Sequence, residues 1–255
     1  MIYIKSQPEI ALMRQAGKIA ATALAIAGKA LTPGVTTQKV NRIIHDYIIG
    51  RDAKPAFLGY GGFPASACIS INSQVIHGIP GDYALRDGDI VKIDVGSIYK
   101  GFHGDCANTF LVGKVSESAQ KLAEVTRQSF YEGIKCAKPG FRVGDISHAV
   151  QQYVEAHGYS IVRNFVGHGL GLKLHEEPEV PNYGTPGRGP RLEAGMTLAI
   201  EPMVNQGGYQ VFVAEDEWTV FTKDNSLSAH FENSVLITDD EPEILTIAEE
   251  QTGGV

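Results

Sequence analysis

An internal repeat is the feature that most limits the fold of this chain. Leu31–Val35 matches Ala137–Phe141, and Leu85–Asp94 matches Leu192–Glu201, in the same order along the chain. The prolines of the first pair lie 106 residues apart, and the central glycines of the second pair lie 107 residues apart. Short Pro-Gly and glycine-turn motifs also match by chance, but chance preserves neither order nor spacing. We therefore interpret the two halves as copies of one unit.

Each copy predicts the same succession of elements. A long helical pattern, Glu9–Ala30 in the first half and Ser118–Cys136 in the second, leads into a Pro-Gly turn. An amphipathic helix follows, running to Ile48 in one half and to Val154 in the other, and strands come after it. A duplicated α/β unit packs about a pseudo-twofold axis so that each copy buries its apolar face. We expect an α/β (α+β) fold in which one curved, mixed sheet is backed by helices.

The chain is interpreted as one catalytic domain spanning residues 1–255. No proline-rich, Gly/Ser-rich or charged linker separates the halves, and both halves supply candidate functional residues. The segment Asn182–Arg191, rich in glycine and proline, is predicted to be a loop over the site rather than a domain boundary.

Charge and composition exclude several classes of protein. The net charge of −7 over 255 residues argues against nucleic-acid binding driven by charge, although a local patch facing the ribosome is compatible with it. Charged residues interrupt any signal-like run in residues 1–17, and the apolar stretch Ile19–Ala27 is too short to span a bilayer. The three cysteines form no CxxC pair. These features predict a cytoplasmic protein with no specific nucleic-acid partner and no membrane partner.

Five residues with metal-binding side chains lie in or beside strand-like segments: Asp94, Asp105, His168, Glu201 and Glu232. Four carboxylates directed at one cavity repel one another unless cations neutralise them. Two divalent ions, about 3.5–4 Å apart as in two-metal aminopeptidases, would supply that charge. A structural zinc site would use cysteines instead. Each acid alone is more typical of a solvated surface, but together they predict a dinuclear metallohydrolase.

Alternation along the strands indicates where these acids point. In the run Ile90–Val95, Val91 and Ile93 share one apolar face, so Asp94 points to the other. In Met196–Glu201 the large residues share one face, and Glu201 lies opposite them among small or polar residues. A hairpin at Gly101–Gly104 would bring Asp105 beside Asp94.

Three histidines accompany the acids. His168 lies among glycines in Val166–Gly171, His175 follows seven residues later, and His77 precedes the first ligand strand. A glycine-rich loop can also cradle phosphate, but this one lacks the strand-loop-helix context of a dinucleotide motif. A lone histidine is more often structural. Beside a carboxylate-rich site, however, His77 and His175 are candidates to donate to a peptide oxygen.

These residues occur in motifs that identify a resemblance. The most specific motifs are Gly59–Pro64, Cys68–Asn72, His77–Pro80, Asp87–Val95, Gly101–Asp105, Gly167–Gly171, His175–Pro178, Ile200–Val204 and Trp218–Val220. From about Lys5 to Ile247 the chain resembles a type I methionine aminopeptidase of the short bacterial subclass, in peptidase family M24. The resemblance implies the duplicated pita-bread fold with pseudo-twofold symmetry. It also implies a monomer that removes N-terminal methionine from nascent proteins, favours a small second residue, and makes transient contact with the ribosome.

The resemblance also assigns roles to the metal-binding residues. Asp94 would chelate one divalent ion, His168 and Glu201 the other, and two bridging acids would bind both: Asp105 and Glu232. The ions could be cobalt, manganese, iron or zinc. A metal-bridging hydroxide would attack the first peptide bond, and Glu201 would carry its proton to the leaving amine.

The remaining site residues come from the resemblance as well. His175 would stabilise the oxygen of the tetrahedral intermediate, and His77 would contact the substrate near the leaving nitrogen. An apolar pocket for the thioether is implied at Phe57, Tyr60, Phe63, Cys68, Leu174 and Trp218. The chain departs from the family pattern at three positions. In the pocket, Leu174 replaces phenylalanine and Phe57 replaces a frequent cysteine; at the pocket rim, Gly61 replaces a frequent histidine.

Two other functions fit parts of this pattern. Proline-specific aminopeptidases and dipeptidases use the same five ligands, but they carry a large additional N-terminal domain. A metal-free binding module of the same fold would have no need of all five ligands and both histidines. Metal content distinguishes the second alternative, and assays on Met-initiated, Leu-initiated and Pro-containing tripeptides distinguish the first.

Overall fold

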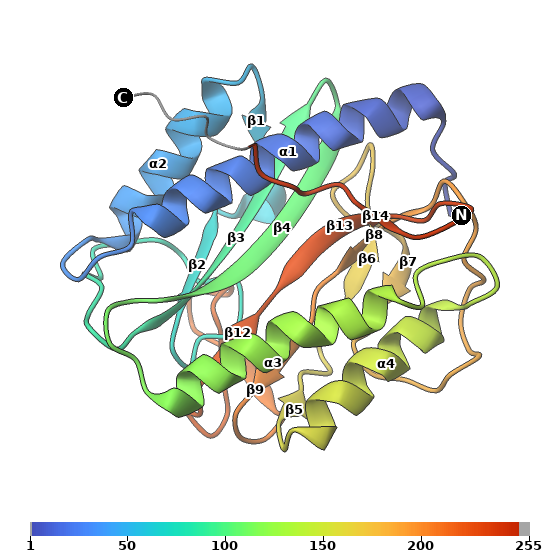
Figure 1. Cartoon of the computed structure of the whole chain (residues 1–255). Coiled ribbons are helices and arrows are strands. Elements are labelled where there is room, and N and C mark those ends of the chain that lie inside the picture. Colours follow the sequence, from blue (N-terminus) through green and yellow to red (C-terminus); the bar gives the residue numbers. More distant parts are fainter. Residues whose placement is uncertain (1, 250–255) are drawn as a thin grey trace.

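The computed structural model describes residues 2–249 and shows an antiparallel sheet of nine strands backed by four helices (Figure 1). The helices are α1 (Gln7–Lys29), α2 (Thr37–Ile49), α3 (Glu117–Ile134) and α4 (Val143–Ala156). The main path of the sheet is β1 (Lys54–Pro55), β3 (Ile90–Tyr99), β4 (Phe102–Leu111), β13 (Glu232–Leu236), β8 (Thr197–Ile200), β6 (Gly167–Gly169) and β7 (Glu176–Val180). Strand β2 (Cys68–Ile71) pairs with β3, and β14 (Glu243–Ile244) pairs with β13.

Smaller elements complete the chain. A three-stranded sheet joins β12 (Ser228–His230), β9 (Met203–Asn205) and β5 (Ser160–Ile161), and a hairpin joins β10 (Val211–Val213) to β11 (Val220–Thr222). A short 3₁₀ turn, η1, covers Tyr60–Gly62.

The strand order confirms the repeat found in the sequence. Outward from the centre, one half contributes β4, β3 and β2, and the other contributes β13, β8 and β6. The matching elements therefore occupy matching places on either side of the β4–β13 pair. Helices α1 and α2 belong to the first half and α3 and α4 to the second, and in Figure 1 each pair lies over its own side of the sheet. The α/β fold predicted from the repeat is present.

The expectation of a mixed sheet was wrong. Every strand pair in the described sheet is antiparallel. In the first half, β3 and β4 are joined by a hairpin whose turn at Lys100 and Gly101 has φ of 48° and 88°. In the second half, β8 and β13 pair antiparallel although β9 to β12 lie between them in the chain. Between the halves, the equivalent strands β4 and β13 also pair antiparallel, as expected for two copies related by a pseudo-twofold axis.

Helix α1 packs on β3 and β4 of the sheet. Its first turn is fixed by the Glu9 carboxylate, which accepts hydrogen bonds from the backbone N–H and from the hydroxyl of Ser6, both at 2.7 Å. Glycines allow it to lie close: a Cβ on Gly104 of β4 would come within 2.3 Å of the backbone nitrogen of Gly17. By length and composition α1 would suffice to cross a membrane, but 61% of its apolar window is buried against the rest of the fold. Packing in the core therefore accounts for its apolar character.

The helix-facing side of the sheet forms the core, as the alternation predicted. Val91, Ile93 and Val95 of β3 pack in one cluster with residues of α1 and α2. Leu198 and Ile200 of β8 pack in an equivalent cluster of the second half with α3 and α4. The opposite face of the same strands is therefore left for polar side chains.

The loop Asn182–Arg191 is not placed as expected. Its backbone bonds to α4: Gly184 N donates to Gln151, and Gly187 N donates to Asp145. Only Asn182, at its first position, contacts a candidate site residue, donating from Nδ2 to the backbone oxygen of Glu201 at 3.0 Å. Polar side chains of α4 thus hold this loop beside the helix, away from the site cavity.

Candidate metal centre and substrate pocket

The register of three strands brings three of the predicted acids together. Asp94 of β3 lies opposite Ala107 of β4, and Ala107 lies opposite Glu232 of β13. Asp105 precedes Ala107 by two residues and shares its face of β4. Because Ala107 is small, the space between the Asp94 and Glu232 carboxylates is left open. Asp105 lies within β4 as a diagonal neighbour of Asp94, close to it as the expected hairpin requires.

His168 and Glu201 join the acids from the second half. His168 of β6 pairs with Ala199 of β8, another small residue, and Glu201 follows two residues later, so it emerges on the same face. His168 Nε2 lies 3.6 Å from Glu201 Oε1. His168 Nδ1 is bonded to the carbonyl oxygen of Gly169 at 2.8 Å, which leaves Nε2 directed at the carboxylates.

A single cavity of about 130 Å³ contains the whole predicted site. It is lined by Phe57, Tyr60, Phe63, Cys68, His77, Asp94, Asp105, His168, Leu174, His175, Glu201, Trp218 and Glu232. All thirteen residues predicted from the sequence are thus brought together, and they divide into a polar end and an apolar end.

Burial dominates the electrostatics of the polar end. It raises the pKa of the Asp105 carboxyl to about 7, and it raises the pKa values of Asp94, Glu201 and Glu232 well above their usual range. The charges of neighbouring carboxylates add to the effect at Asp94, Glu201 and Glu232. Four such groups within one cavity are unstable as anions without a compensating cation.

Three carboxylate oxygens at the polar end are suited to bind divalent ions. Asp94 Oδ1, Asp105 Oδ1 and Glu232 Oε1 are buried, and none has a hydrogen-bond partner within residues 2–249. Ligand atoms of Asp105, His168 and Glu232 lie within 4.8 Å of one another, close enough to share an ion. Buried oxygens without partners and one imidazole form the donor set of manganese, iron, cobalt or zinc centres.

Two histidines stand at the border between the polar and apolar ends. Nδ1 of His175 lies 2.6 Å from the Tyr60 hydroxyl, and the His175 ring lies 4.3 Å from that of His168. His77 has a left-handed backbone, with φ of 58°, and its ring contacts the Trp218 ring edge-on. Burial lowers the pKa of His77 to about 4 and lowers that of His175, so both are neutral near pH 7.

The apolar end is a compact wall of buried side chains. Phe57, Phe63, Cys68 and Leu174 belong to one cluster, with Trp218 packed against it. The Phe63 and Trp218 rings meet edge-on at 5.1 Å. Leu174 is only 2% exposed, so the residue that departs from the family pattern is part of this wall.

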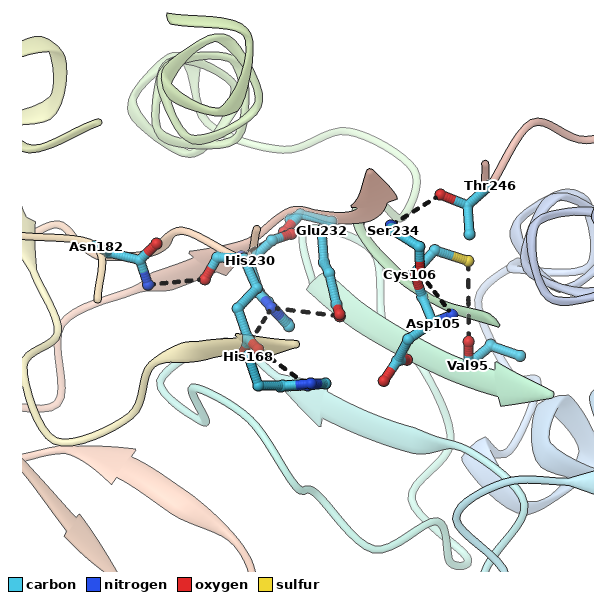
Figure 2. A network of polar contacts seen from close by, with 11 residues as sticks. Val95, Asp105, Cys106, His168, Asn182, His230, Glu232, Ser234 and Thr246 are labelled. Carbon is cyan, nitrogen blue, oxygen red and sulfur yellow. Dashed lines mark hydrogen bonds and ion pairs between the residues drawn. The ribbon is translucent and has the colours of Figure 1, made fainter. Parts of the chain in front are cut away.

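One residue at the site was missed by the sequence analysis. His230, at the end of β12, is 1% exposed, and its Nε2 lies 3.8 Å from Glu201 Oε2 and 4.0 Å from Glu232 Oε2 (Figure 2). Burial lowers its pKa to about 3. A signal was available: His230 precedes Glu232 by two residues, so strand alternation places both side chains on one face.

A second groove adjoins the cavity. It has a volume of about 620 Å³ and shares His168 and His175 with the cavity. The side chains farther out are Tyr3, Leu172, Lys173, Glu176, Glu177 and Glu179. Glu179 is the cross-strand neighbour of His168, so the face that carries the acids continues to the edge of the sheet at β7. The groove therefore gives the cavity an extended opening.

Comparison with known proteins connects this arrangement with a family. The model for metallopeptidase family M24 matches residues 11–239. A methionine aminopeptidase of Clostridium perfringens (strain 13 / Type A) is 56% identical over 247 residues, which are 97% of this chain and 99% of that relative. The crystal structure of methionine aminopeptidase from Thermotoga maritima has a TM-score of 0.95 and 47% identity, covering 96% of this chain and 99% of that one.

Proline-specific peptidases share the fold less closely. The prolidase from Pyrococcus furiosus has a TM-score of 0.76 and 25% identity. The match covers 97% of this chain but only 66% of the prolidase. Similarity to the methionine aminopeptidases is thus both higher and spread over the full length of the relatives.

Proposed function

The chain belongs to metallopeptidase family M24 and is a metal-dependent aminopeptidase that removes N-terminal methionine; we propose that its centre holds two divalent ions. The proposed ligands are Asp94, Asp105, His168, Glu201 and Glu232. The observation that carries the proposal is the cavity itself, where buried carboxylate oxygens without partners adjoin a closed apolar wall. When bound, such ions polarise a peptide carbonyl and acidify water.

The proton transfer is assigned to Glu201. Its side chain retains 12% exposure and lines the cavity, where the carboxylate can take a proton from an attacking water and return it to the leaving nitrogen. Burial, with the charge of Asp105, raises the pKa of Glu201, which is the direction of shift that favours a carboxyl group able to hold a proton as well as release it.

His175 and His77 are assigned to the peptide bond. If the Tyr60 hydroxyl donates to Nδ1, the proton of neutral His175 lies on Nε2, where it can be donated to the carbonyl oxygen as negative charge develops. His77 lies between Phe165 and Trp218, at the rim of the apolar wall, where it can contact the substrate backbone next to the leaving nitrogen.

The shape of the cavity supports methionine as the side chain that is recognised. Phe57, Phe63, Cys68, Leu174 and Trp218 offer an apolar, polarizable wall suited to an unbranched thioether. The volume of about 130 Å³ accommodates one side chain of moderate size. The crowded metal end favours a small second residue, and the adjoining groove provides a path for the rest of the peptide.

The setting of the activity is also part of the proposal. We infer that the chain acts as a single domain and a monomer in the cytoplasm, on the N-terminal peptide of nascent proteins, with transient contact at the ribosome. Strands of both halves share one sheet, which supports the single domain.

An assay on three peptides tests the function. Purified chain loaded with manganese should release methionine from Met-Ala-Ser at a kcat/KM at least tenfold above that for Leu-Ala-Ser, and should leave Pro-containing tripeptides intact. Preference for a Pro-containing substrate would favour the prolidase-like alternative. Full activity in protein shown to contain no metal would overturn the metal centre.

A further inference from the structure

His230 has a side chain that nothing in the fold satisfies. It is 1% exposed, and neither Nδ1 nor Nε2 has a hydrogen-bond partner within residues 2–249. An imidazole always carries at least one N–H donor, and leaving a buried donor unpaired costs about 1–3 kcal/mol. Buried polar groups without partners are rare and call for an explanation.

The other histidines show how unusual this is. Six of them bond through Nδ1 to a protein oxygen: His45, His103, His148, His157, His168 and His175. The seventh, His77, is partly exposed. His230, the most deeply buried of the eight, is therefore the one buried histidine of the described chain whose ring has no such bond.

The backbone of His230 is firmly placed. The backbone N–H of His230 donates to the Thr109 hydroxyl at 2.9 Å. The Thr109 hydroxyl in turn donates to the backbone oxygen of His230 at 2.9 Å. His230 also pairs with Met203 of β9. The fold therefore holds this residue at the site while leaving both ring nitrogens uncommitted.

The ring faces the Glu201 carboxylate from one side. Its Nε2 lies 3.8 Å from Oε2, while His168 Nε2 lies 3.6 Å from Oε1, so each oxygen of Glu201 has one imidazole beside it. The backbone oxygen of Glu201 is held by Asn182. His168 lines the cavity and His230 does not, so His230 stands behind the carboxylate rather than at the substrate.

We propose that His230 is a positioning residue that donates a ring N–H to the outer oxygen of Glu201 and so fixes this carboxylate for metal binding and proton transfer. The inference rests on the proposed metal centre. A shift of about 0.6 Å or more, shared between the two side chains, brings the 3.8 Å separation of Nε2 and Oε2 within hydrogen-bond distance. Carboxylate ligands of metal ions ordinarily accept such bonds from behind, and losing one typically weakens metal binding about 10–100-fold.

Manganese binding to the metal-free full chain tests the proposal independently of activity. Calorimetric titration should show that His230→Leu and His230→Met each weaken manganese binding about 10–100-fold without changing the number of ions bound. His230→Gln keeps an N–H donor and should stay within about threefold of wild type. The two apolar variants guard against a failure of one to fold, and their metal-free melting temperatures should not fall, because an unsatisfied buried group has been removed.

His148→Leu is the matched control, since His148 is a partly buried histidine of α4 that bonds to Gly184 and lies outside the cavity. It should bind manganese as wild type does. Wild-type affinity in both apolar His230 variants would overturn the proposal. So would loss of one ion in all three His230 variants, which would make His230 a ligand. Failure of the wild-type chain to bind manganese would instead overturn the proposed metal centre.

Discussion

The Tyr60 hydroxyl lies 2.6 Å from Nδ1 of His175, and this contact fixes how the histidine faces the cavity. Tyr60 belongs to the 3₁₀ turn Tyr60–Gly62, while His175 immediately precedes β7, so the bond joins the two halves of the chain across the pocket. Neutral His175 has one ring proton, and with the Tyr60 hydroxyl as the donor to Nδ1 that proton lies on Nε2. In that arrangement Tyr60 sets the tautomer of His175 as well as contributing to the pocket.

Tyr60→Phe should therefore lower kcat about tenfold while changing KM little, because the ring remains and one hydrogen bond of about 1.4 kcal/mol is lost. Tyr83→Phe is the control, as its hydroxyl bonds to Asp89 outside the cavity. Steady-state kinetics on Met-Ala-Ser would check both. A change confined to KM would mean that Tyr60 serves only the pocket.

Replacement of His175 or His77 by alanine should lower kcat/KM about a hundredfold or more, the scale for loss of an oxyanion donor or a proton-transfer group. Neither residue supplies a proposed metal ligand, so the manganese content of both variants should equal that of wild type. Elemental analysis of the purified variants would check this. Loss of an ion from His175→Ala would contradict its assignment to the substrate.

Removal of the metal should make stability depend on pH through Asp105. Its pKa is about 7 in the folded chain against an ordinary value of 3.8, so the folded state holds the proton more tightly. Protonated Asp105 therefore contributes to the free energy of unfolding. The contribution is fully present below about pH 4, is lost between pH 4 and pH 7, and is of the order of 4 kcal/mol.

Denaturant unfolding of metal-free protein at pH 5 and pH 8 would measure the effect. Wild type should be less stable at pH 8. Asp105→Asn should lose part of that difference because asparagine does not ionise, while the raised pKa values of Asp94, Glu201 and Glu232 maintain the rest. Manganese at pH 8 should restore stability to the wild-type chain. Equal stability of the metal-free wild type at both pH values would disprove the electrostatic account.

The adjoining groove should favour basic residues downstream in the peptide. Glu177 and Glu179 are exposed in this groove, and neither has an ion-pair partner within residues 2–249. Peptides with lysine at the fourth or fifth position should show a lower KM than those with glutamate, more so at low salt. The double variant Glu177→Gln, Glu179→Gln should remove this preference without affecting kcat. A preference that survives would place the peptide elsewhere.

Sequence reasoning could place the acids because each follows from local rules. Asp94 lies within β3 and Glu201 directly follows β8; the other face of both strands is apolar, and alternation alone directs the two acids away from the core. The division of the chain into two matching halves could likewise be predicted, because the repeat is visible in the sequence. For His230, alternation with Glu232 indicated only the shared face. Its closeness to Glu201 depends on how β12 pairs with β9 and on the contact with Thr109, neither of which has a local signal. The loop Asn182–Arg191 was misplaced for the same reason, since its hydrogen bonds to α4 are tertiary.

Selectivity for methionine should depend on Leu174, which is buried in the pocket wall and replaces the phenylalanine of the family pattern. Phenylalanine forms a flat, rigid wall, whereas leucine is smaller and branched, so the pocket here has a different outline. Pockets distinguish side chains that differ by a methylene by about 1–3 kcal/mol, so one wall residue changes the preference measurably. Leu174→Phe should raise the ratio of kcat/KM for Met-Ala-Ser over Leu-Ala-Ser severalfold. Leu172→Phe, in the outer groove, is the control and should leave the ratio unchanged. If Leu174→Phe also left it unchanged, Leu174 would not contact the substrate side chain.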